Sequence, residues 1–170
     1  MADESLVHTA SQTVGPFLHI ALADPRARYA VEPNFPGAIV VRGTVTDGAG
    51  DPLADAMIET WQIDGLFARC PTDADGTFEI HTRKPPPVAT LDDTPQAPHL
   101  SVSVFARGLL DRVVTRIYFG DEAAANAADP TLAMVGPDRR RCLVAEPDAD
   151  GGYRFDIRLQ GDDESVFFSI

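Results

Sequence analysis

Short stretches of the chain alternate apolar and polar residues or are rich in β-branched and aromatic residues, as half-buried β-strands are. Seven stretches have this character: residues 39–46, 56–63, 76–82, 99–104, 113–119, 153–159 and 165–168. Turn-forming sequences separate them, and most of the 14 prolines and 13 glycines lie between the apolar runs. This pattern predicts an all-β chain that folds as a sandwich or a barrel.

Two parts of the sequence lack the strand pattern. Residues 121–128 are alanine-rich, begin with two acids and are followed by Asp129-Pro130, which predicts one short helix that ends there. Residues 1–37 show no strong periodicity and contain four prolines. We therefore expect an extended N-terminal arm over residues 1–37, packed on the core or on a partner chain, and a β-sandwich core over residues 38–170.

Charge and composition restrict the function. The 170 residues include 26 acids and 14 bases, a net charge of −12, which argues against binding to nucleic acid or to an anionic membrane surface. There is no apolar run of transmembrane length, and the acidic N-terminus lacks the apolar segment of a secretory signal. Cys70 and Cys142 are too far apart for a CxxC zinc site, so we expect a cytoplasmic protein with reduced thiols.

Few residues stand out as candidates for chemistry. His99 and Ser101 lie two positions apart on a predicted strand, where a second histidine would give a common metal-binding pair. Alone, His99 is more typical of a structural histidine. Arg107 follows a predicted strand and has the geometry to clamp a carboxylate, although its spacing alone favours a solvated arginine. The chain has no G-x-S-x-G nucleophile elbow and no glycine-rich phosphate loop.

Several short motifs occur in a fixed order from residue 11 to residue 168. They are Ser11-Gln-Thr-Val-Gly-Pro-Phe17, Gly43-x-Val45-x-Asp47-Gly48, Glu59-Thr-Trp-Gln62, Thr82-x-Lys84-Pro85, Ala97-Pro-His99, Phe105-Ala-Arg-Gly108, Thr115-Arg-Ile-Tyr-Phe119, Tyr153-Arg-Phe-Asp-Ile157 and Gln160-Gly161 with Val166-Phe-Phe168. Taken together, they resemble the intradiol ring-cleavage dioxygenases. The resemblance implies a β-sandwich and a non-haem ferric ion, held by two tyrosines and two histidines, that activates a catecholate for ring opening by O2.

The same resemblance shows that this chain lacks most of those iron ligands. Phe67 and Val88 stand where the family has its two tyrosines, and Ser101 replaces one of the two histidines. Only His99 remains of the four ligands. Phenylalanine and valine offer no donor atom, and Fe(III) prefers hard anionic oxygen ligands. We therefore expect no metal ion on this chain.

A chain with this loss resembles the α chain of a heteromeric member of the family, which pairs with a β chain that holds the Fe(III). By resemblance, Thr13, Gly15 and Pro16 of the arm face the bound aromatic acid, and Arg107 lies near its pocket. The implied substrates are 3,4-dihydroxybenzoate and O2, and the product is 3-carboxy-cis,cis-muconate. One departure is a segment between Arg69 and Thr77 that is shorter than in many relatives.

Two other interpretations stay open at this stage. The chain could be a free-standing β-sandwich binding module that has kept the fold and lost the chemistry. It could also be a homomeric enzyme that uses His81 with His99 and nearby acids, although no second histidine has suitable spacing to His99.

Overall fold

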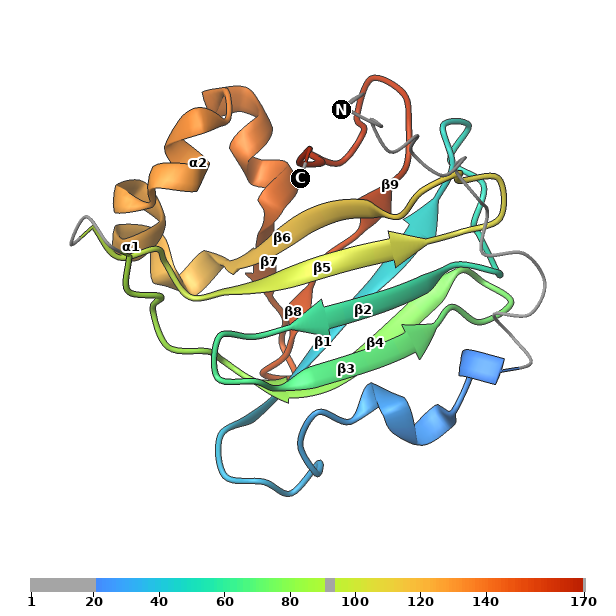
Figure 1. Cartoon of the computed structure of the whole chain (residues 1–170), viewed down its shortest axis with the longest axis horizontal. Coiled ribbons are helices and arrows are strands. Elements are labelled where there is room, and N and C mark those ends of the chain that lie inside the picture. Colours follow the sequence, from blue (N-terminus) through green and yellow to red (C-terminus); the bar gives the residue numbers. More distant parts are fainter. Residues whose placement is uncertain (1–20, 91–93, 170) are drawn as a thin grey trace, which may run out of the picture.

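The alternating stretches form the strands of a β-sandwich (Figure 1). The structure is a computed structural model and describes residues 21–90 and 94–169. The strands in these ranges are β1 (Ala38–Thr46), β2 (Met57–Trp61), β3 (Phe67–Pro71), β4 (Thr77–Arg83), β5 (His99–Phe105), β6 (Val113–Phe119), β7 (Val144–Pro147), β8 (Tyr153–Arg154) and β9 (Ile157–Arg158). The all-β sandwich expected from the sequence is confirmed.

The strands pair in the order β3-β2-β5-β6-β7-β8-β1-β4, and β9 also pairs with β1. In Figure 1, β3, β2, β5 and β6 lie in front and β1 and β4 lie behind them, so the sheet folds back on itself as two layers. Most pairs are antiparallel, whereas β7 runs parallel to β6, and β8 and β9 run parallel to β1. The core between the layers is made of side chains at alternate positions, including Val41, Val45, Ile58, Ile80, Leu100, Val102, Val104 and Ile117.

A helical segment covers one end of the front layer. It contains η3 (Gly120–Glu122), α1 (Ala123–Ala128), α2 (Pro130–Met134) and η4 (Pro137–Leu143). The sequence predicted one helix ending at Asp129-Pro130, but this part of the chain holds two short α-helices. Asp129 is the N-cap of α2, with its side chain accepting from the Leu132 N–H, and Pro130 is the first helical residue. Proline after an N-cap residue begins a helix as readily as it ends the one before it.

Two strands were not expected from the sequence, and one expected strand is absent. β3 and β7 are short and each ends in proline, so neither shows a clear alternation. Residues 165–168 were predicted to be a strand and are not one. They run beside β6 and are linked to it by separate hydrogen bonds and not by a ladder. The Phe168 N–H donates to the Val114 carbonyl at 2.8 Å, and the Thr115 hydroxyl donates to the Val166 carbonyl at 2.7 Å.

The described part of the predicted arm packs on its own core. It contains one 3₁₀ turn, η2 (Pro25–Arg28), and then runs beside β4. The Ala30 N–H donates to the His81 carbonyl at 2.8 Å, and the rings of Tyr29 and His81 lie 4.5 Å apart. The division into an arm over residues 1–37 and a core over residues 38–170 remains a prediction. In the two described ranges, we find no helix with the length and apolar character needed to cross a membrane.

Candidate functional site

A broad groove runs along the outer face of β2, β5 and β6. We call it the sheet groove, and its volume is about 1100 Å³. Its apolar walls include Trp61 and Met134, whose side chains are among the most exposed large hydrophobic residues described. Its charged walls are Glu59, Arg69, Asp111, Arg112 and Arg116. Among its described wall residues, three arginines outnumber two acids, on a chain whose net charge is −12.

One row of residues crosses the sheet at this groove. Strand register places Trp61 opposite Phe67 of β3 on one side and Ser101 of β5 on the other, and Ser101 lies opposite Arg116 of β6. Paired residues of neighbouring strands point to the same face of a sheet, so all four side chains belong to the outer face. The Trp61 and Phe67 rings contact each other at a centroid distance of 4.5 Å. Two of the four expected metal-ligand positions, Phe67 and Ser101, therefore share this row.

Arg116 is the charged side chain at the end of the row. Its Nη1 donates to the Gln96 Oε1 at 3.0 Å, to the Tyr118 hydroxyl at 3.1 Å and to the Thr131 Oγ1 at 3.2 Å. All three acceptors are uncharged, and within residues 21–90 and 94–169 no carboxylate forms an ion pair with Arg116. No pattern in the sequence singles out this residue as a site candidate. The available signal was a charged residue in the otherwise apolar stretch of β6.

Val88 is connected to Arg116 through Gln96. The backbones of Val88 and Gln96 form an isolated β-bridge, with N–H to carbonyl distances of 3.0 and 2.9 Å. Because the side chain of Gln96 accepts from Arg116, Val88 lies next to the residue that contacts the guanidinium. Ser101 lines the sheet groove, Phe67 contacts its wall residue Trp61, and Val88 is bridged to Gln96, which contacts Arg116.

His99 lies two residues before Ser101 on the same face of β5, but it is buried whereas Ser101 is exposed. The side chain is buried, its Nδ1 is 2.8 Å from the Ala97 carbonyl oxygen, and its ring lies 5.4 Å from the ring of Tyr118. Burial lowers the pKa of His99 below its usual value, against the opposing effect of the hydrogen bond to Ala97. Burial thus disfavours the charged form of His99.

The donor set at the four family positions does not fit a ferric ion. Phe67 and Val88 have no donor atom and the Ser101 hydroxyl is a weak neutral ligand, which leaves only the single imidazole of His99. In the described part of the chain there is also no group of three His, Cys, Asp or Glu side chains placed to hold a metal ion. The chemistry that this face supports is the binding of an anion at Arg116.

The other predicted site residues lie elsewhere. Thr13, Gly15 and Pro16 are outside the described residues. Arg107 lies in the loop after β5, with 85% of its side chain exposed, and its Nε is 2.8 Å from the Asp55 carboxylate. It is not part of the sheet groove, so its contact with a substrate remains a prediction. The short segment between Arg69 and Thr77 forms a tight turn in which the Asp73 carboxylate accepts from the Thr77 N–H at 2.9 Å.

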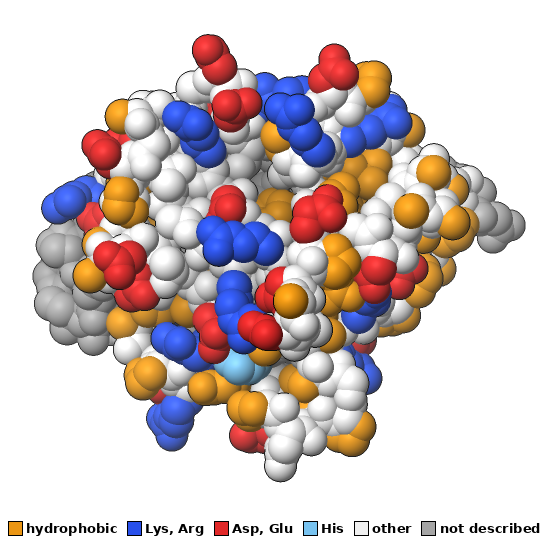
Figure 2. Space-filling view, turned by 180° about the vertical axis from the view of Figure 1, so that it is seen from behind, with side chains coloured by type: hydrophobic (Ala, Val, Ile, Leu, Met, Phe, Trp, Pro, Cys, Tyr) orange, Lys and Arg blue, Asp and Glu red, His pale blue; other side chains and the backbone are white. Residues whose placement is uncertain are grey.

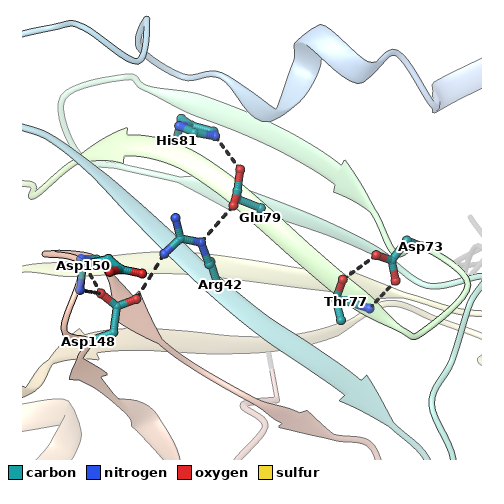
Figure 3. A network of polar contacts seen from close by, with 8 residues as sticks. Arg42, Asp73, Thr77, Glu79, His81, Asp148 and Asp150 are labelled. Atoms are coloured by element: carbon teal, nitrogen blue, oxygen red, sulfur yellow. Dashed lines mark hydrogen bonds and ion pairs between the residues drawn. The ribbon is translucent and has the colours of Figure 1, made fainter.

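A second polar cluster lies on the outer face of the back layer, where Figure 2 shows Lys and Arg side chains beside Asp and Glu. Arg42 donates to Glu79 at 2.9 Å and to Asp148 at 3.2 Å, and the His81 Nε2 lies 2.8 Å from Glu79 (Figure 3). The hydrogen bond from Arg42 holds the pKa of Glu79 below its usual range. The charged side chains of this cluster are thus paired with one another. Because His81 lies on this outer face and His99 on that of the front layer, the fold does not bring the two histidines together as one site.

Comparison with curated proteins finds relatives along the whole chain. The chain is 40% identical to the protocatechuate 3,4-dioxygenase alpha chain of Burkholderia cepacia, over 98% of this chain and 99% of that one. It is 39% identical to the alpha chain of the same enzyme from Pseudomonas putida, over the full length of both. The beta chain from B. cepacia is 30% identical over 74% of this chain and 65% of its own length.

Solved structures agree on the fold. The dioxygenase domain of a carbohydrate-binding fusion protein from Streptomyces sp. SirexAA-E superimposes with a TM-score of 0.61 at 22% identity, over 95% of this chain and 96% of that one. Catechol 1,2-dioxygenase from Pseudomonas arvilla C-1 superimposes with a TM-score of 0.57 at 22% identity, over 81% and 58% of the two chains. No family model matches the sequence.

Proposed function

The chain belongs to the intradiol ring-cleavage dioxygenase family, among the alpha chains of protocatechuate 3,4-dioxygenase, and on this premise we propose that it is the non-iron-binding alpha subunit of such an enzyme. The assembled enzyme opens the ring of 3,4-dihydroxybenzoate between its two hydroxyl-bearing carbons. Both atoms of O2 enter the product, 3-carboxy-cis,cis-muconate, so atoms balance without a further reductant. The partner is a β chain homologous to this one, since a beta chain is also among its relatives.

One combination of findings supports this proposal. The chain is similar to alpha chains over its full length, and its side chains at the four expected ligand positions cannot hold iron. The relatives that match the chain from end to end are alpha chains. At the positions where the family resemblance expects four ligands, the chain has Phe67, Val88, His99 and Ser101. The Fe(III) that activates the catecholate is therefore assigned to the β chain.

In this proposal, the chain forms part of the wall of the substrate pocket and adds positive charge near it. From the sequence alone, we expect Gly15-Pro16 to form a rigid turn against which a flat ring can pack, and Thr13 to supply a hydroxyl. Arg107 presents an exposed guanidinium that pairs with Asp55 through Nε, and its remaining N–H groups attract an anionic substrate to an otherwise acidic protein. These four residues orient and attract the substrate, and none of them transfers a proton or forms a covalent bond.

The proposal is tested directly by iron binding to the chain alone and by the activity of its complex with the β chain. The chain is purified alone, incubated with Fe(III) and examined for the visible tyrosinate-to-iron absorption band, and we expect none. Co-expressed with its β chain, it should form a larger complex on size exclusion that consumes O2 and 3,4-dihydroxybenzoate in equal amounts. A coloured iron complex of this chain alone contradicts the proposal. Failure to form a complex with any β chain favours a free-standing binding module.

A further inference from the structure

The row that crosses the sheet groove has the dimensions of a small aromatic acid. Trp61 and Arg116 are two strands apart with Ser101 between them, and neighbouring strands are about 4.8 Å apart, so the two backbones are separated by roughly 10 Å. This backbone separation is comparable to the length of a benzoate-sized molecule, with the indole ring at one end and the guanidinium at the other. The groove's volume of about 1100 Å³ leaves room for such a ligand.

The charges of the groove favour an anion at one particular end. Glu59 pairs with the guanidinium of Arg69, with 2.7 Å between the Arg69 Nε and the carboxylate, so that arginine is already neutralised. Arg116 instead uses one nitrogen, Nη1, for neutral oxygen atoms. Its Nε and Nη2 donate to no described residue. A planar guanidinium with two donors available is suited to a carboxylate.

The structure also fixes this guanidinium before any ligand arrives. Gln96, Tyr118 and Thr131 hold the Nη1 from three different segments of the chain, and the Phe168 ring lies 6.0 Å from the guanidinium carbon. A donor held in place loses little side-chain entropy when it binds, which favours affinity for even a small ligand.

We propose that the sheet groove is a second, non-catalytic binding site for aromatic carboxylates, in which Arg116 binds the carboxylate and Trp61 contacts the ring. Ser101, between them, offers its exposed hydroxyl to a ring substituent. Where the family resemblance expects a metal cation, this chain then places the cation of an arginine side chain. The site depends on no iron and on no ring cleavage, so it can be tested even if the proposed function is wrong.

The full chain carries its own optical probe, because Trp61 is the only tryptophan in the sequence. We would titrate the full chain with 3-fluorobenzoate, following the Trp61 fluorescence and the fluorine NMR line width of the ligand. The expected result is one saturable transition in both signals. The uncharged analogue 3-fluorobenzamide should bind at least about tenfold more weakly, because it lacks the charge that pairs with Arg116.

Variants locate the site. Arg116→Gln should weaken 3-fluorobenzoate binding by at least about tenfold, and Arg116→Lys by less, since it keeps the charge but not the planar pair of donors. The matched control is Arg154→Gln, which removes the same charge from the other layer, where Arg154 is paired with Asp156. It should bind like the wild type. Near-ultraviolet circular dichroism verifies that each variant is folded.

A second experiment uses the assembled enzyme and does not require the chain to be stable alone. Crystals of the complex with the β chain are soaked in 4-bromobenzoate, and the anomalous bromine signal is located. We expect a peak between Trp61 and Arg116 in addition to any peak at the catalytic site. The proposal is overturned if the groove has no bromine peak, if the amide binds as tightly as the acid, or if Arg116→Gln binds like the wild type.

Discussion

The buried carboxylate of Asp129 accepts a hydrogen bond from the Tyr118 hydroxyl, with 3.2 Å between the two oxygen atoms. Asp129 begins helix α2, and Tyr118 lies on β6, so this bond joins the helical segment to the front layer. The same carboxylate accepts from the backbone N–H groups of Leu132 and Ala97, both at 2.8 Å. Tyr118 in turn accepts from Arg116, so the position of the groove's guanidinium depends on this side chain.

Replacing Asp129 should therefore be costly. Asp129→Ala removes a helix cap and leaves the buried N–H of Ala97 without an acceptor. We expect the free energy of unfolding to fall by about 2–4 kcal/mol, measured by urea denaturation. Asp129→Asn keeps one carbonyl oxygen and should lose less. Equal losses for the two variants would show that hydrogen bonding at this position is not what stabilises the segment.

Gly43 is predicted to tolerate no side chain. A Cβ built on this residue of β1 would lie 1.7 Å from the Phe155 carbonyl oxygen, which belongs to the neighbouring backbone and cannot move aside. Gly43→Ala should lower the free energy of unfolding by about 3 kcal/mol or more, or prevent folding. Gly136→Ala is the control, because nothing lies within 4 Å of its Cβ position and its φ of −53° suits alanine. Thermal unfolding compares the two variants.

His99 should make stability depend on pH in a defined direction. Because burial lowers its pKa from the usual 6.5, the folded chain resists protonation of this ring and the unfolded chain does not. Below about pH 6.5 the unfolded state binds the extra proton, so the free energy of unfolding falls as the pH is lowered, and the full contribution of His99 is present above that pH. His99→Gln should flatten the slope between pH 7.5 and 5.5 in urea titrations. An unchanged slope would falsify this assignment.

Arg107 should affect substrate capture by the assembled enzyme. Its side chain is exposed, and a rim charge acts chiefly on the attraction of an oppositely charged ligand. Arg107→Gln should raise KM for 3,4-dihydroxybenzoate roughly three- to tenfold at low salt, with little change in kcat or thermal stability. Asp55→Asn, which removes the carboxylate paired with Arg107, should leave KM unchanged or lower it. A fall in kcat alone would contradict the proposed role.

Local patterns in the sequence were reliable where one face of a strand is buried. The predicted strand over residues 113–119 is β6, and residues 39–46 differ from β1 by one residue. Residues 153–159 were read as one strand, but only β8 and β9 form ladders there. Between them, the Asp156 carboxylate accepts from the Thr44 N–H at 2.9 Å. A side chain thus takes the place of a ladder bond, and no periodicity reveals that.

For the candidate site, too, the sequence predicted some features and missed others. The sequence identified Phe67, Val88, His99 and Ser101 as positions of interest, because motif order is a property of the chain itself. It did not identify Arg116, whose importance depends on a strand register that places it opposite Ser101. It also did not predict that His99 would be buried, since its ring packs near the ring of Tyr118, which lies on a different strand.

By itself, the sequence determined the all-β class, the family and the lack of donor atoms at Phe67 and Val88, because alternation, motif order and side-chain chemistry are local properties. The tertiary structure alone decided where the remaining charge lies and what it faces. Register across β2, β5 and β6 aligned Trp61, Ser101 and Arg116 on one face, and three segments fixed the guanidinium there. Such an alignment depends on which strands become neighbours, and only long-range packing determines that.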